Sequence, residues 1–586
     1  SSIYYMSSIK TVLIEDSKIA DITEELTYGV KSFASQSTFQ PYQATSVSKS
    51  NINFSIQVPS ESIVIDREIL IQADMTLKLS YTGVPADEIV MSYGKDCSMA
   101  AFPINSLFLT TQCTINNANV SENTQDVMAM LLNMYDKREL QRYNSMTPSF
   151  VDDCYGDLSD AVNSTNNPMG SILSSSLDSS FMGRGAFPVE ITIYHKVNGL
   201  GTPDTSLVSV GEADTWDIYI KGTYTEPFLC LSPWLNSLPT AGKAGFMGIN
   251  NMSFILNLDS ECKRVFTTGS LELVGQYPTP KYLTGISLTK SDNSTGLDNV
   301  KLLMNFLSLS PEQMGRLSGT KNVVPYLTYP RFLSNANQNS PIAAGAKSVA
   351  LTSQSIQLSS IPDKILIACR VPMSQQNSAI ANAFLAIKGI SVTFNNASGL
   401  LSTASQQDLF SKVSYPSGSS QNFTAFSGNV LINNATDGKV ENIPSIGSVL
   451  VLDPCAHFSL PSYLSAGSLG QFQFQFNLTV DNQFPYGITP ELVIITVNSG
   501  VFSVSAGTSA IYTGLLTKET VLDAKSKSPK LTIGEYDRMI GGAKNLLGMS
   551  ALKIKGAGMS GGGMSGGGVS GGGMSGGMRR RIDSLM

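Results

Sequence analysis

The chain has 586 residues and a mass of 62.6 kDa, which is too long for one hydrophobic core and indicates two large domains or several small ones. Charged residues make up only 14% of the chain, against a usual ~25%, while 42% of it is hydrophobic. This composition excludes a disordered chain and disfavours long helical bundles. The net charge of −6 argues against a chain that binds polyanions over its whole surface.

Residues for metal or nucleophilic chemistry are scarce. There are two histidines, His195 and His457, and the odd number of widely spaced cysteines contains no CxxC pair. We therefore expect reduced, buried thiols rather than a disulfide scaffold or a zinc ribbon, and neither a metal nor a cofactor. No apolar run reaches the ~18–20 residues that span a bilayer, and no signal-peptide pattern opens the sequence. The cysteines are Cys97, Cys113, Cys154, Cys230, Cys262, Cys369 and Cys455.

Strand patterns dominate the predicted elements in chain order. One helix is predicted over 124–142, with Thr124 as its N-cap and Val127, Leu131 and Met134 at helical spacing. Strands are predicted at 189–193, 217–220, 252–259, 471–480 and 492–497. In 471–480 apolar and polar residues alternate without a break, which is typical of a strand with one buried face. Pro, Gly and Asn clusters between such segments favour a β-sandwich.

An internal repeat is the most informative feature of the sequence. Similar segments occur in the same order in both halves of the chain, and their separation falls from 296 to 220 residues. A falling separation means that the first half carries the longer insertions. The matching segments are 65–71 with 361–367, 114–118 with 393–397, 125–126 with 407–408, 226–235 with 453–464, and 257–258 with 477–478.

The repeat predicts two similar β domains in tandem. We place a first domain at 45–310 and a second at 323–515, joined by a connector at 311–322. An N-terminal arm, 1–44, precedes them and a C-terminal tail, 516–586, follows.

The tail differs from the rest of the chain. Residues 524–586 contain ten Lys or Arg and three Asp or Glu, a net charge of +7, which leaves −13 for residues 1–523. Residues 556–577 repeat Met-Ser-Gly-Gly-Gly with a five-residue period, so we expect a flexible segment unless a partner orders it. The G-x-S-x-G matches in this tract lack the strand and helix that a hydrolase nucleophile needs.

Two further sets of side chains have alternative interpretations. Asp152, Asp153 and Asp157 suggest a calcium site, but their spacing fits no standard loop and favours a solvated acidic loop. Trp234 and Tyr463 occupy equivalent places in the two halves. Sugar stacking would use such rings, but a repeated packing role explains better why both halves have one.

The sequence resembles the double jelly-roll major capsid proteins of virophages and polinton-like viruses, in the wider lineage of adenovirus hexons. The segments that carry the resemblance are 146–152, 166–170, 226–229, 324–330, 390–396 and 488–522. It implies an all-β fold of two tandem eight-stranded jelly rolls. The loop insertions, the one short helix and the flexible Gly-rich tail are expected from the residues themselves, and the tail departs from the family's pattern. The resemblance further implies a non-enzymatic virion protein, assembled in the host cell, that trimerises into pseudo-hexameric capsomers and tiles an icosahedral shell around DNA.

The resemblance also implies partners and sites. Expected partners are further copies of the chain and penton and minor capsid proteins. The positive charge of the tail, and not the resemblance, suggests contact with the genome at Lys553, Lys555, Arg579, Arg580 and Arg581. Relatives use a protease that cuts after short glycine motifs, which would place processing sites at Gly541, Gly542 and Gly556, although we favour an intact, partner-bound tail. A surface or secreted β-sandwich lectin or adhesin remains an alternative, as does a glycosidase with two carboxylates in a cleft.

Overall fold

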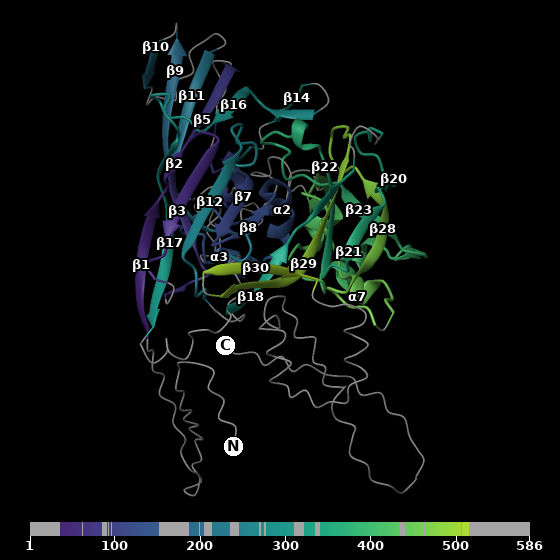
Figure 1. The fold of residues 1–586 in the computed structure, drawn as a ribbon. Coiled ribbons are helices and arrows are strands. Elements are labelled where there is room, and N and C mark those ends of the chain that lie inside the picture. The colour runs from purple at the N-terminus through teal and green to yellow at the C-terminus, as the bar shows by residue number, and fades with distance from the viewer. Residues whose placement is uncertain are drawn as a thin grey trace, which may run out of the picture.

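The structure is a computed structural model that describes most of residues 35–514 (Figure 1). Within this range it leaves out 61–62, 85–90, 92, 95–96, 152–186, 198–199, 204–213, 235–244, 269–270, 275–276, 310–321, 335–339, 434–439, 462 and 506. The tail residues, the three acidic residues of the suggested calcium loop and Cys154 all lie outside the described part.

The first half of the chain forms two antiparallel sheets packed face to face. One sheet has the strand order β1 (Ser35–Gln43), β17 (Leu297–Leu309), β5 (Leu70–Val84), β11 (Asp214–Pro227), β9 (Glu190–Val197) and β10 (Leu200–Pro203). Two short strands also join it: β16 (Leu283–Ser287) pairs with β5, and β4 (Val64–Ile65) pairs with β17. The other sheet has the order β2 (Ser46–Val47), β3 (Asn51–Gln57), β12 (Asn251–Leu258), β7 (Phe108–Ile115) and β8 (Ala118–Glu122).

The second half repeats this arrangement. One sheet has the order β18 (Asn322–Thr328), β29 (Glu491–Ser505), β22 (Lys364–Arg370) and β27 (Leu450–Leu452), and β19 (Arg331–Leu333) and β30 (Thr508–Thr513) pair with β29. The other has the order β20 (Val349–Thr352), β28 (Leu469–Asp481), β23 (Ala386–Phe394) and β24 (Ala397–Leu400), with β21 (Ile356–Ser360) also on β28. Three small hairpins complete the strands: β6 (Cys97–Met99) with β13 (Phe266–Thr268), β14 (Leu271–Val274) with β15 (Tyr277–Pro280), and β25 (Asn429–Asn433) with β26 (Val440–Pro444).

The two halves are jelly rolls of the same topology. In the first sheet of each half, β1 corresponds to β18–β19, β17 to β29, β5 to β22 and β11 to β27. The other sheet of each half corresponds strand by strand in the same way. The sequence repeat reflects this, because Asn116 and Asn395 both take the left-handed conformation (φ of 51° and 49°) at the same hairpin turn. The longer first half is explained in part by strand length, since β5 and β11 are 15 and 14 residues long and β22 and β27 are 7 and 3.

The predicted strands are confirmed, and burial alternates along those with one solvent-facing side. In β28 the residues Phe472, Phe474, Phe476, Leu478 and Val480 are buried, while Gln473 and Asn477 are exposed. Each jelly roll encloses its own apolar core between its two sheets. The strand β1 lies within the segment assigned from sequence to an N-terminal arm, and it pairs along its length with β17.

The predicted helix over 124–142 is interrupted. It consists of α2 (Thr124–Leu131), the 3-10 turn η1 (Leu132–Met134) and α3 (Lys137–Gln141). The break follows from Tyr135, which is extended and donates its hydroxyl to the Leu229 carbonyl at 2.8 Å, after which Asp136 caps α3. The prediction of Thr124 as N-cap is wrong, because Asn123 takes the cap position. The Thr124 hydroxyl is instead buried 3.0 Å from that of Thr111.

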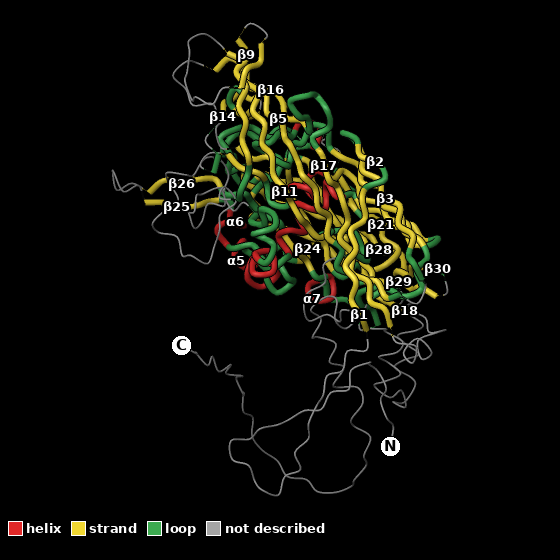
Figure 2. The backbone as a smooth tube through the Cα atoms, turned by 90° about the vertical axis from the view of Figure 1, so that its left-hand side faces the viewer, coloured by secondary structure: helices red, strands yellow, loops and turns green. Residues whose placement is uncertain are grey.

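Further short helices connect the strands. They are α1 (Pro103–Leu107), η4 (Met373–Gln375), α5 (Gln406–Asp408), the π-helical η5 (Leu409–Ser414), α6 (Phe423–Ser427) and α7 (Pro454–His457). Figure 2 shows α5 and α6 at one edge of the molecule and the long strands of the first jelly roll facing the viewer. None of the helices in the described ranges is long and apolar enough to cross a bilayer.

Candidate functional site

The junction between the two jelly rolls is the most extensively buried contact outside the two cores. Helix α2 lies between them (Figure 1), and its side chains Val127, Met130 and Leu131 are at most 6% exposed. They belong to one apolar cluster with residues of the sheet β18–β29–β22–β27. The second jelly roll contributes Leu327, Tyr329, Leu366, Ala368, Phe384, Val449, Val451, Val493, Ile495 and Val497.

Strand β29 shows how the junction is built. Leu492 and Ile494 point into the core of the second jelly roll, whereas Val493 and Ile495 point outward into the junction. A strand buried on both faces has a continuous apolar run instead of an alternating one. The run at 492–497 therefore encodes both a core and a contact surface.

A buried ionic cluster crosses this apolar junction. Asp126 of α2, 1% exposed, contacts the guanidinium groups of Arg370 on β22 and Arg331 on β19. Arg370 is 3% exposed and also lies 3.3 Å from Glu491, and burial lowers its pKa from the ordinary value. Because an unpaired charge is costly in such a place, we expect the cluster to favour this alignment of the two domains.

Two other buried groups support the same contact. Glu122 at the end of β8 accepts a hydrogen bond from the backbone N–H of Tyr329, and burial raises the pKa of Glu122 to about 8. Arg264 donates to the carbonyl of Gln125 at 2.5 Å and to that of Phe108 at 3.1 Å, so that it holds the start of α2 against β7. Burial lowers the pKa of Arg264 to about 10.

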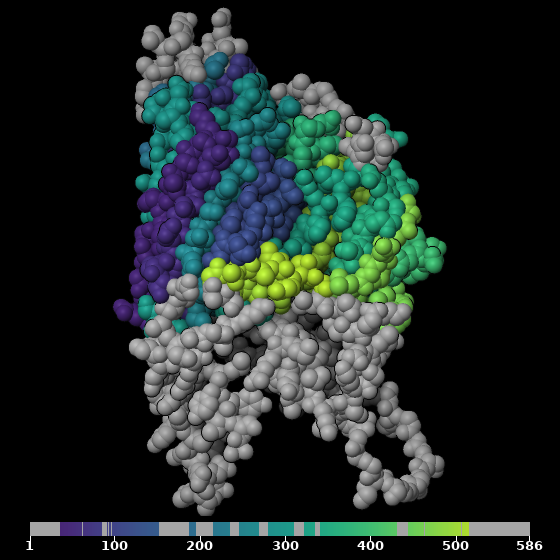
Figure 3. All heavy atoms as spheres, in the orientation of Figure 1, coloured from purple at the N-terminus to yellow at the C-terminus, as the bar shows by residue number. Residues whose placement is uncertain are grey.

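A second zone of the junction involves the C-terminal strands. Phe502 of β29 packs edge-on against Phe246 of the first jelly roll, with ring centroids 5.7 Å apart. The β30 backbone N–H of Ser509 donates to the side chain of Asn117 at 2.7 Å. Figure 3 shows these yellow-green strands directly against the blue segment of the first jelly roll. The two jelly rolls thus contact each other at two buried zones.

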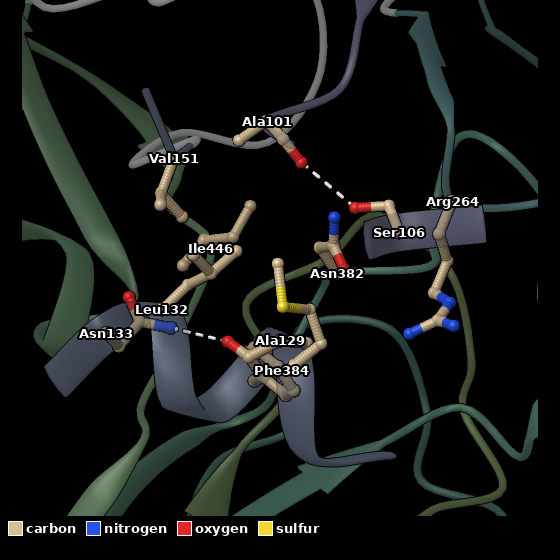
Figure 4. Close-up of a pocket in the computed structure, with 11 residues that line it drawn as sticks. Ala101, Ser106, Ala129, Leu132, Asn133, Val151, Arg264, Asn382, Phe384 and Ile446 are labelled. Carbon is tan, nitrogen blue, oxygen red and sulfur yellow. Dashed lines mark hydrogen bonds between the residues drawn. The ribbon is translucent and has the colours of Figure 1, made fainter. Parts of the chain in front are cut away.

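One cavity lies at the junction, but it is too small for a ligand. Ala101, Ser106, Leu132 and Arg264 from the first jelly roll and Phe384 and Ile446 from the second are among its lining residues (Figure 4). Its volume of about 30 Å³ holds roughly two water molecules. Small-molecule sites usually measure ~300–1,000 Å³, so this cavity suits neither a sugar nor a substrate.

The structure places the remaining candidates from the sequence in structural roles. Trp234 is 1% exposed in the core of the first jelly roll, where its indole N–H donates to Cys113 Sγ at 3.2 Å, so the packing interpretation is confirmed. Its counterpart Tyr463 is half-buried. Five described cysteines are buried free thiols as predicted, but Cys455 is exposed on α7. The His457 side chain accepts a hydrogen bond from the backbone N–H of Asp453 at 3.1 Å.

No group of three or more His, Cys, Asp or Glu side chains in the described part of the chain is arranged to hold a metal ion. Two tandem jelly rolls with one strand order and a buried junction define the class of double jelly-roll proteins.

Comparison with known proteins identifies the family. The model of the first domain of the Sputnik virophage major capsid protein matches residues 7–307, and that of the C-terminal domain of major capsid protein V20 matches residues 329–500. The putative capsid protein V20 of Sputnik virophage is 26% identical over 561 residues, covering 92% of this chain and 86% of that protein. The chain belongs to the Sputnik virophage major capsid protein family, and it is a structural protein of the virion.

Solved structures show the same fold. The Sputnik virophage structure superposes with a TM-score of 0.70 at 22% identity, over 90% of this chain and 98% of that one. The mavirus major capsid protein gives 0.62 at 16% identity, over 90% and 100%.

Sequence reasoning missed the ionic cluster of the junction. The repeat did pair Gln125-Asp126 with Gln407-Asp408, and both aspartates lie at the third position of the corresponding helices, α2 and α5. Only Asp126 is buried, because only α2 has a second jelly roll against it.

Proposed function

We propose that three copies of the chain form a capsomer with a pseudo-hexagonal outline, and that these capsomers tile an icosahedral shell around a DNA genome. The observation that carries the proposal is the buried junction between two jelly rolls of identical topology. Three chains supply six such units, and a contact that repeats around a ring closes it without leaving free surfaces. The role is structural and needs no enzymatic activity.

Other partners follow from the same assembly. Neighbouring capsomers, penton proteins and minor capsid proteins would bind the outer sides of the trimer. The positive tail, with Lys553, Lys555, Arg579, Arg580 and Arg581, would face the shell interior, where packaged genome is the nearest polyanion. We propose that this tail stays intact and bound to partners rather than being cut at Gly541, Gly542 or Gly556.

Native mass spectrometry of the purified protein tests the trimer directly. The expected species has three times the 62.6 kDa mass of the chain, and negative-stain images should show a near-hexagonal outline. A stable monomer or dimer under assembly conditions would contradict the proposal.

A further inference from the structure

Besides Tyr512 on β30, which is 45% exposed, exposed aromatic rings are found at two separate places on the described surface. Phe39 on β1 is 79% exposed, and Tyr415 and Phe423, at η5 and α6, are 64% and 38% exposed. The half-buried ring of Phe410 packs against both of the latter, with centroid distances of 6.5 and 5.4 Å. Burying an aromatic ring removes a large apolar area from water, so clustered exposed rings indicate a contact surface.

The first place corresponds to a buried position in the other jelly roll. Leu366 lies opposite Ile495 in the second jelly roll, as its repeat counterpart Leu70 lies opposite Leu303 in the first. Two residues further along the strand in the first jelly roll, Asn305 lies opposite Phe39. At the matching position of the second jelly roll, Val497 lies opposite Tyr329. This register follows from the pairs on either side, Thr328–Asn498 and Arg331–Ile495. Phe39 is therefore the counterpart of Tyr329, which is only 4% exposed because it is packed in the junction.

The second place corresponds to the other side of the same junction. The helical segment α5–η5–α6 follows β24 as α2 follows β8. Helix α2 is buried between two jelly rolls, whereas η5 buries Leu409 and Val413 in its own core and leaves Tyr415 exposed. The segment touches the first jelly roll through Ser420, whose backbone N–H and hydroxyl donate to the Asn133 carbonyl at 2.7 and 2.8 Å, while its Tyr415 and Phe423 rings stay exposed.

We propose that the α5–η5–α6 surface of one copy binds the outer face of β1 in a second copy, so that Tyr415 and Phe423 are buried against Phe39. The contact repeats, between chains, the junction that each chain contains. Figure 2 shows β1 among the strands that face the viewer and α5 and α6 at the left-hand edge, so one chain presents the two halves of the contact at separate places. The interface is heterologous, and it closes into a ring at three copies if each jelly roll advances by one sixth of a turn. This inference rests on the proposed trimer.

Single-sided variants test the contact. Phe39→Glu removes one half and the double variant Tyr415→Glu/Phe423→Glu removes the other. Ile255→Glu on β12, as exposed as Phe423 at 38%, is the matched control. Phe39→Glu and the double variant should each raise the dissociation constant of the trimer by about 30-fold or more, as expected for interface hot spots. Ile255→Glu should remain trimeric.

Mixing the two defective variants gives the decisive result. The first keeps an intact helical surface and the second an intact β1, so the mixture should form one-to-one heterodimers that neither variant forms alone. Unchanged thermal unfolding of the separate variants would show that both are folded. Two results would overturn the inference: trimers that persist in both variants as they do in the control, or folded variants that fail to pair when mixed. Neither result would contradict the trimer formed by the unmodified protein.

Footprinting of the unmodified protein gives a test that needs no variant. Hydroxyl radicals should oxidise Phe39, Tyr415 and Phe423 in dilute monomer and much less in trimer, with Ile255 equally reactive in both. Equal reactivity of the three aromatics in a proven trimer would overturn the contact. If the unmodified protein forms no trimer, the proposed function fails first, and the inference fails with it.

Discussion

The replacement Asp126→Asn tests whether the ionic cluster holds the two jelly rolls together. It keeps the shape of the side chain and removes the charge that faces Arg370 and Arg331. Arg370, 3% exposed, would keep only the 3.3 Å contact with Glu491. Removing one partner of a buried ion pair typically costs about 3–5 kcal/mol, because the remaining charge stays desolvated.

The repeat supplies a matched control for this replacement. Asp408 occupies the same helical position, but it pairs at the surface with Lys412 at 2.6 Å, and its side chain is 37% exposed. Surface ion pairs contribute little to stability, and asparagine keeps the side-chain oxygen that can accept from Ser405, so Asp408→Asn should change stability little.

Calorimetric unfolding at a fixed scan rate measures both variants. For a unit of the size of one jelly roll, 1 kcal/mol shifts the midpoint by about 2–4 °C, so Asp126→Asn should lower it by roughly 6–20 °C. The two jelly rolls should also unfold as two resolved transitions once the junction is weakened. Equal midpoints for Asp126→Asn and Asp408→Asn would refute the reasoning.

The remaining predictions concern pH and the tail. The folded protein holds the Glu122 proton up to about pH 8, whereas the unfolded chain releases it near the ordinary value of 4.5, so stability should fall as the pH rises between these values. Glu122→Gln should flatten this dependence in unfolding experiments at pH 5, 7 and 9, and an unchanged slope would show that another group causes it. Deletion of 556–586 should leave trimers intact but alter packaging or shell assembly; unfolded trimers would mean that the tail is structural. Intact-mass measurement on mature particles should give the full-length chain, and a species ending at Gly542 would demonstrate processing.

Local patterns in the sequence determined a large part of the fold. The alternation at 471–480 predicts a strand with one buried face because side-chain direction has a period of two in any sheet, whatever lies beyond it. The repeat predicted two similar domains, since similar segments in one order require similar positions in a common topology. The uneven charge of the tail is likewise a property of composition alone.

Tertiary structure alone decided what covers each apolar surface. Asp126 and Arg370 are 244 residues apart, and no local pattern links them. The run at 492–497 indicates a strand but not that its outer face meets α2 of the other jelly roll. Asp126 and Asp408 occupy the same position in the repeat, yet one is buried and the other is at the surface, because burial depends on the neighbour and not on the segment. Periodicity reports which residues share a face, whereas the partner of that face is fixed only when distant parts of the chain come together.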